Sequence, residues 1–146
     1  APLIAHPAIR TRGTIGGSIA FADPAAELPA CFLALGGEAE IAGKGGGRWV
    51  KADDFFKGLY ETAIGPDEVL TAIRLPAAKP NMRYGFAELS RRHGDYALAG
   101  LAASAHADGA SLKDVRLAYF GVGLMPVRAK HAEAALAKGS IDDAVT

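Results

Sequence analysis

Hydrophobic and polar residues alternate along several stretches of the chain, and a period of two is typical of β-strands. Residues 68–75 alternate in this way and are closed by Pro76. The dipeptide Asp108-Gly109 is a strong turn signal between two later stretches of the same kind. The pattern therefore predicts strands at residues 68–75, 84–91, 98–106 and 115–120.

A hairpin and several helices complete the predicted elements. Residues 38–42 and 48–51 are strand-like and flank the glycine-rich segment 43–47, which predicts a β-hairpin. Asp23 and Pro24 have the residue types of an N-cap and a first helical position, so we expect a helix from Pro24 to Leu35. Further helices are predicted at residues 128–138 and from Ser140 onward, with a short helix or turn at 52–56 and a linker at 77–82.

Composition excludes several classes of function. The 146 residues carry 16 basic and 16 acidic side chains, so nothing indicates a nucleic-acid-binding surface. No apolar run approaches the roughly 20 residues that cross a membrane, and the first residues do not resemble a signal peptide. The single Cys31 lies in an apolar run, where a buried free thiol is expected, and it fits a cytoplasmic protein.

The most informative segment is a glycine pair between two hydroxyl residues, Thr14 and Ser18, followed by Glu27. Glycines let the backbone approach a ligand closely, and consecutive free N–H groups can bind an anion such as a diphosphate. A nearby carboxylate can accept a hydrogen bond from a ribose hydroxyl. These residues therefore indicate a nucleotide cofactor held by a glycine loop. A structural turn is the alternative, because the pattern is neither a dinucleotide fingerprint nor a P-loop.

Five ordered segments resemble the flavin-binding subunit of the molybdenum hydroxylases, which include xanthine dehydrogenase and aerobic carbon monoxide dehydrogenase. They span nearly the whole chain, so the resemblance is far more specific than the glycine pair alone. The segments are HPAIRTRGTIGGSIAFADPAAELPA (6–30), FFKGLYET (55–62), PDEVL with IRLP (66–76), SRRHGDYAL (90–98) and GVG with PVRA (121–129).

The resemblance implies an α+β protein in two parts. Residues 1–78 would be the second FAD-binding subdomain, with a mixed or antiparallel sheet and helices. Residues 79–146 would be a small C-terminal domain with an antiparallel sheet and helices. The resemblance also implies an N-terminal flavin subdomain that these residues do not contain, so we expect the chain to be a piece of a longer or split subunit.

The resemblance also implies the residues of the cofactor site. Thr14, Ile15, Gly16, Gly17 and Ser18 would wrap the diphosphate and ribityl part of FAD. Glu27 would hold a ribose hydroxyl, Ile4 would line the adenine or ribityl pocket, and Leu70 would pack near the flavin. Asp95 and Tyr96 would belong to a loop over the isoalloxazine ring, where Tyr96 shields the ring and Asp95 influences its potential.

Each of these residues has a structural alternative. Glu27 also suits the first turn of a helix, where the helix dipole favours a carboxylate. Ile4 and Leu70 would be ordinary core residues if the match slips by one position. Gly94-Asp95 could be a simple turn, with Tyr96 opening the next strand. The four histidines show no metal-binding spacing, and no hydrolase motif is present.

The predicted function is FAD-dependent electron transfer within a molybdenum hydroxylase. Electrons would pass from the molybdenum cofactor on a large subunit, through iron–sulfur clusters on a small subunit, to FAD and then to an external acceptor. By the same resemblance the substrate would be chosen at molybdenum, on another chain, so this sequence leaves it open. Two alternatives remain: a fragment that folds and assembles with partners without binding FAD, and an unrelated binding domain.

Overall fold

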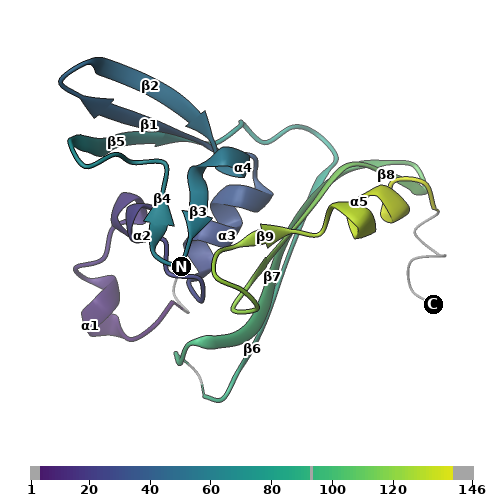
Figure 1. Cartoon of the computed structure of the whole chain (residues 1–146). Coiled ribbons are helices and arrows are strands. Elements are labelled where there is room, and N and C mark those ends of the chain that lie inside the picture. Colours follow the sequence, from purple (N-terminus) through teal and green to yellow (C-terminus); the bar gives the residue numbers. More distant parts are fainter. Residues whose placement is uncertain (1–3, 93, 140–146) are drawn as a thin grey trace.

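The computed structural model describes residues 4–92 and 94–139. Their helices and antiparallel sheets confirm the predicted α+β class (Figure 1). The helices are α1 (Pro7–Arg10), α2 (Ile15–Phe21), α3 (Glu27–Ala34), α4 (Ala52–Phe55) and α5 (Lys130–Leu136). The strands are β1 (Glu38–Gly43), β2 (Gly46–Lys51), β3 (Phe56–Gly58), β4 (Glu61–Thr62), β5 (Glu68–Arg74), β6 (Met82–Ser90), β7 (Ala97–Asp108), β8 (Ser111–Phe120) and β9 (Val127–Arg128).

The first sheet has the strand order β2-β1-β5 and contains the predicted hairpin. The hairpin register runs from Glu38 opposite Lys51 to Gly43 opposite Gly46. Gly46 has a φ of +106°, which a residue with a side chain rarely adopts, and this explains a glycine at the turn. Ala39 and Ile41 of β1 are fully buried, so one face of this sheet packs on the core.

The last sheet is a meander with the strand order β6-β7-β8-β9. The predicted turn between β7 and β8 is confirmed, because Asp108 pairs with Ser111 and Gly109 has a φ of +60°. Gly100 of β7 lies under the ring of Phe120: a Cβ atom at position 100 would lie 2.1 Å from its Cζ. The close packing of this sheet therefore depends on one glycine beside one buried aromatic ring.

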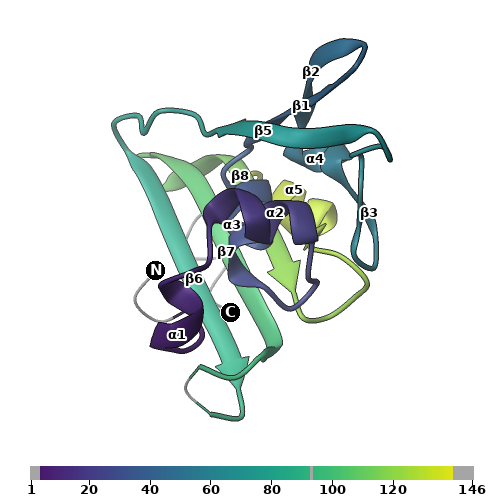
Figure 2. The ribbon, with the colours of Figure 1, turned by 90° about the vertical axis from the view of Figure 1, so that its left-hand side faces the viewer.

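Helix α3 packs against the last sheet and against α2 and α4 (Figures 1 and 2), and its buried residues share one core with Ala39 and Ile41 of the first sheet. Phe32 of α3 makes edge-to-face contacts with Phe55 and Phe56, with ring centroids 6.1 and 6.3 Å apart. All three rings are at most 6% exposed. Because they come from α3, α4 and β3, burial of these aromatic rings holds these three elements together.

Three local predictions were wrong. Helix α3 begins at Glu27 rather than at Pro24, because the Asp23 carboxylate accepts a bond from the Ala25 N–H (2.9 Å) and so closes a separate turn. The glycine segment is not a loop: Gly16, Gly17 and Ser18 lie inside α2. Helix α5 is also shorter than the predicted 128–138. The helix expected from Ser140 lies outside the described residues.

Among the described residues, no helix is long and apolar enough to cross a membrane.

Candidate cofactor site

Helix α2 begins at a side-chain cap that the sequence supplies itself. Thr14 is extended, with φ −121° and ψ 152°, and its Oγ1 accepts a hydrogen bond from the Gly17 N–H at 3.0 Å. The Ser18 N–H donates to the Thr14 carbonyl at 3.1 Å. The N–H groups of Ile15 and Gly16 lie in the first turn, ahead of the Ser18 N–H that is the first donor of the helix, so they have no acceptor within the helix and remain available to a ligand. An exposed helix start with free donors suits an anionic group.

The two glycines of α2 differ in their surroundings. A Cβ atom on Gly17 would lie 2.8 Å from Thr14 Oγ1, so a side chain there would disturb the cap. A Cβ atom on Gly16 would lie 3.9 Å from Leu70 Cδ2, which is ordinary contact. The structure therefore brings Leu70, on β5, beside the glycine pair, as a shared site requires. Gly17 has a structural reason to be glycine, whereas Gly16 does not.

Glu27 is the first residue of α3 and is half-buried. The prediction that it lies in the first helical turn is confirmed. Burial raises the pKa of Glu88 on β6, and the negative charge of Glu27 raises it further. The two carboxylates therefore lie close enough to interact. The sequence analysis missed Glu88, because nothing in the sequence pairs a β6 residue with the start of α3.

Ile4 lies in a bend that Arg10 closes. The Arg10 Nη1 donates to the carbonyl oxygens of Ile4 and Ala5, at 2.8 and 2.6 Å. Ala5 has a φ of +44°, so this bend is unusual for a residue with a side chain. Arg10 had no assigned role in the sequence analysis, and here its guanidinium fixes the segment that contains Ile4.

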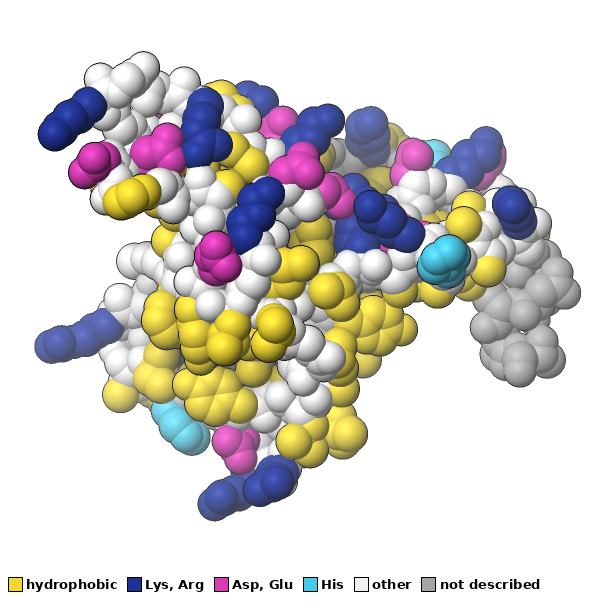
Figure 3. All heavy atoms as spheres, in the orientation of Figure 1, with side chains coloured by type: hydrophobic (Ala, Val, Ile, Leu, Met, Phe, Trp, Pro, Cys, Tyr) yellow, Lys and Arg dark blue, Asp and Glu magenta, His cyan; other side chains and the backbone are white. Residues whose placement is uncertain are grey.

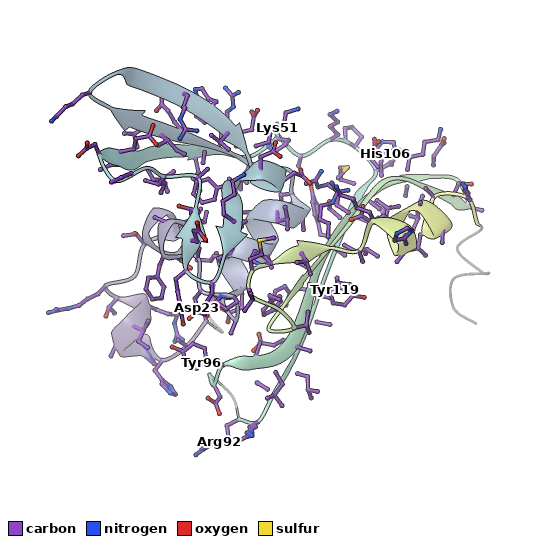
Figure 4. All side chains as sticks on the ribbon, in the orientation of Figure 1. Asp23, Lys51, Arg92, Tyr96, His106 and Tyr119 are labelled. Atoms are coloured by element: carbon purple, nitrogen blue, oxygen red, sulfur yellow. The ribbon has the colours of Figure 1, made fainter. Side chains whose placement is uncertain are left out.

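The loop between β6 and β7 lies against this bend. A Cβ atom on Gly94 would lie 3.2 Å from His6 Cε1 and 3.3 Å from the Ala5 carbonyl oxygen. Within the loop, Asp95 Oδ1 accepts the Tyr96 N–H at 3.0 Å, so its carboxylate stabilises the turn. The Tyr96 side chain is 71% exposed. Figure 4 shows Tyr96 and Arg92 near the end of the last sheet opposite to His106.

The predicted site residues thus fall into two groups, apart from Glu27 at the start of α3. Thr14 to Ser18 lie with Leu70, whereas Ile4 lies with the loop of Asp95 and Tyr96. Figure 2 shows α1, α2, α3 and β6, which carry or border both groups, on the same side of the molecule. Thr14, Ile15 and Gly17 are exposed, so the described residues form an open surface and not an enclosed pocket.

A second surface feature lies at the other end of α2. The rings of Phe21 and Tyr60 have centroids 5.0 Å apart, and both side chains are more than half exposed, as is Leu59. Figure 3 shows hydrophobic side chains gathered in the middle of this face of the molecule. The sequence analysis gave these residues no role beyond the FFKGLYET segment.

An ion-pair network that the sequence analysis also missed joins the two halves of the chain. Asp53, in the first turn of α4, accepts bonds from Arg116 and Arg128, both at 2.7 Å. Arg128 makes a forked contact with Glu133 at 2.9 and 2.6 Å, and the Leu117 N–H donates to the same carboxylate at 2.8 Å. The network spans α4, β8, β9 and α5, so no single sequence segment contains a signal for it.

The charges of this network are mutually stabilised. Burial alone raises the pKa of Asp53, but the hydrogen bonds from Arg116 and Arg128 outweigh it and hold the pKa below the ordinary value. Burial likewise raises the pKa of Glu133, and the bonds from Arg128 and the Leu117 N–H lower it by more. Both carboxylates are therefore ionised at neutral pH.

Comparison with known proteins identifies the family. Residues 1–78 match the FAD binding domain in molybdopterin dehydrogenase, and residues 84–146 match the CO dehydrogenase flavoprotein C-terminal domain. The chain belongs to the medium-subunit flavoproteins of the molybdenum hydroxylases. The resemblance drawn from the five sequence segments is thereby confirmed.

Individual relatives and solved structures agree with this membership. The nicotine 6-hydroxylase medium subunit of Paenarthrobacter nicotinovorans is 44% identical over 118 residues, which are 81% of this chain and 41% of that protein. The carbon monoxide dehydrogenase medium chain of Afipia carboxidovorans is 39% identical over 140 residues, 96% and 49% of the two chains.

The fold comparison gives the same family. Carbon monoxide dehydrogenase from Hydrogenophaga pseudoflava superposes with a TM-score of 0.94 at 39% identity, over 98% of this chain and 50% of that chain. Quinoline 2-oxidoreductase from Pseudomonas putida 86 superposes with a TM-score of 0.85 at 39% identity, over 97% and 49%. This flavoprotein chain thus spans about half the length of the relatives that it matches.

Proposed function

We propose that this chain forms one side of an FAD site and serves electron transfer in a molybdenum hydroxylase. The observation that carries the proposal is the position of Leu70 beside Gly16, distant in sequence: a Cβ atom added to Gly16 would lie 3.9 Å from Leu70 Cδ2. It places an apolar side chain beside the free N–H donors at the start of α2. A diphosphate and an adjoining apolar part of one ligand would require that combination.

The residues of α2 fit the diphosphate of FAD. The N–H groups of Ile15 and Gly16 would donate to phosphate oxygens, because neither has an acceptor within the helix. Thr14 Oγ1 already binds the Gly17 N–H, so Thr14 would act mainly by fixing the helix start. Ser18 is half-buried and would offer its hydroxyl from the side of the helix.

The remaining predicted residues would act around this anchor. Glu27 would accept a ribose hydroxyl, and Leu70 would pack against the flavin. Ile4, held by Arg10, would line the ligand from the other side. Tyr96 has an exposed ring that can stack on a flat heterocycle, and Asp95 would hold its loop in place.

In the assembled enzyme, electrons would pass from the molybdenum cofactor of a large subunit to an iron–sulfur small subunit. Bound FAD would accept them from the small subunit and would reduce an external acceptor. The matched medium subunits support these partners. We further infer a companion N-terminal flavin subdomain, because Thr14, Ile15 and Gly17 are open to solvent on the side that a diphosphate would occupy. A reducing compartment such as the cytoplasm is our prediction from the single cysteine.

A titration of the purified chain with FAD, followed by flavin fluorescence, tests the proposal. Gly16→Ala should weaken FAD binding at least about tenfold, because its methyl group would occupy the surface beside the free donors. It should leave the melting temperature equal or higher, since alanine favours a helix over glycine by up to about 1 kcal/mol. Unchanged FAD affinity in Gly16→Ala would refute the assignment of this surface.

Gly45→Ala is the matched control. Gly45 lies in the hairpin turn with no atom within 4 Å of an added Cβ, so this variant should bind FAD as the wild type does. If the wild-type chain binds no FAD, the second candidate function gains support: a fragment that assembles with its partners and needs the companion subdomain to hold the cofactor. Co-purification with the small and large subunits then tests assembly directly.

A further inference from the structure

The C-terminal end of α3 is capped by side chains from the last sheet. The Leu33 carbonyl oxygen accepts bonds from Arg116 Nε and Nη2, at 3.1 and 2.7 Å. The Ala34 carbonyl oxygen accepts a bond from Ser104 Oγ at 2.7 Å, and Ser104 is 4% exposed. A cation beside the last carbonyls of a helix is favoured by the helix dipole. Residues far along the chain therefore fix the end of this helix.

Arg116 is itself held in place. Asp53 accepts its Nη2 at 2.7 Å and also accepts Arg128, which Glu133 holds by a forked contact. The side chains of Arg116 and Arg128 are 21% and 17% exposed. The Arg116 guanidinium thus links the end of α3 to the charges of Asp53, Arg128 and Glu133. Hydrogen bonds to the Leu33 carbonyl and to Asp53 fix its position.

The opposite end of α3 carries a predicted cofactor ligand. Glu27 is the first residue of the helix, and no side chain caps that end. An eight-residue α-helix is a rod of about 12 Å, so a shift at the capped end moves the whole rod along its axis. The cap and the buried face of α3 together hold this rod, and Glu27 lies at its other end.

We propose that Arg116 is a positioning residue for the cofactor site: by capping α3 it sets the place of Glu27. This inference rests on the proposed function, because it gives Glu27 its role toward FAD. Arg116 contacts no ligand in this scheme. It acts through the helix, and Asp53 keeps its guanidinium on the Leu33 carbonyl.

A double-mutant cycle with Glu27 tests the inference in the chain assembled with the companion flavin subdomain. Arg116→Ala should raise the Kd for FAD about tenfold, and in a Glu27→Ala background it should change the Kd less than about twofold. A purely structural role would give similar losses in both backgrounds, and this result would overturn the inference. A Glu27→Ala variant with wild-type affinity would also overturn it, although FAD binding itself would stand.

Two further variants control for folding. Arg74→Ala removes an ion pair with Glu38 and a cation–π contact with Trp49 on the first sheet, and it should leave the Kd unchanged. Arg116→Lys keeps the charge but not the fork that reaches both Leu33 and Asp53, so it should raise the Kd about threefold. If Arg116→Ala does not fold, Arg116→Lys carries the same cycle, and additivity with Glu27→Ala overturns the inference.

Cys31 supplies a readout that needs no flavin. This thiol lies on α3 and lines an open hollow of about 460 Å³ together with Leu75 and Phe86. Displacement of α3 in Arg116→Ala should raise its reaction rate with a thiol reagent at least about threefold, relative to Arg74→Ala. An unchanged rate would overturn the inference even if the chain bound no FAD. A wild-type chain that never binds FAD in any assembly would instead refute the proposed function.

Discussion

Replacing Asp53 by alanine should lower the melting temperature of the chain by about 5 °C. Asp53 accepts Arg116 and Arg128 at 2.7 Å each, and its own side chain is 29% exposed. Each pair is partly screened by solvent, so we assign each the upper value of an exposed pair, about 1 kcal/mol. The sum of about 2 kcal/mol lies below the 3–5 kcal/mol for breaking a fully buried pair.

The conversion to temperature follows from chain size. For a domain near 150 residues, 1 kcal/mol corresponds to a shift of roughly 2–4 °C in the melting temperature. Thermal unfolding at pH 7, followed by circular dichroism, measures the shift. The effect should shrink in high salt, because the network is partly open to solvent.

Asp108→Asn is the control for Asp53→Ala, because it removes the charge while Asn keeps the turn preference of Asp108-Gly109. Asp108 pairs with Lys113, and their side chains are 57% and 63% exposed, so the control should melt with the wild type. Equal shifts for the two variants would refute the reasoning, since they would mean that Asp53 is no more than a surface charge. A shift in Asp53→Ala that survives high salt would contradict the screening used for the magnitude.

Two other predictions concern the packing of the last sheet and the ion pairs that join it to α4 and α5. Gly100→Ala should destabilise the chain by about 2 kcal/mol, because its Cβ would lie 2.1 Å from the fully buried Phe120 ring. Adding Phe120→Leu to this variant should recover part of the loss. Urea unfolding of the single and double variants measures both effects. The ion pairs also predict acid sensitivity, because the pKa values of Asp53 and Glu133 are lower in the folded than in the unfolded chain. Their contribution to the free energy of unfolding is therefore complete above the pKa range of unfolded carboxyl groups, and it is lost as the pH falls below about 4. Glu133→Gln should flatten this fall in a pH series of melting temperatures, and an unchanged slope would count against the assignment.

Local signals in the sequence were sufficient for many of the elements. The hairpin around residues 43–47, the strand that ends before Pro76 and the turn at Asp108-Gly109 were predicted and are present. Alternation along a strand and a glycine in a turn are properties of neighbouring residues, so they can be read without the fold. The family resemblance was also available from five ordered segments, and the family matches confirm it.

The sequence misjudged the elements whose ends depend on competing local bonds. Thr14 caps α2, so the glycine pair is helical, although glycines between hydroxyl residues are also typical of a loop. Asp23 bonds to the Ala25 N–H and closes a turn instead of starting α3. Both outcomes depend on which N–H group the capping side chain reaches, and composition does not decide that.

What the sequence by itself determined, then, is the family and the α+β class, and it supplied a predicted set of residues that would hold a flavin. Only the tertiary structure decided that Leu70 lies beside Gly16, that Gly94 lies against the bend at Ala5, and that Arg116 caps α3 while bound to Asp53. The physical reason is that these contacts join residues from elements far apart in the chain. Such contacts form only when burial of the α3 core brings those elements together, and no pattern within one segment records the pairing.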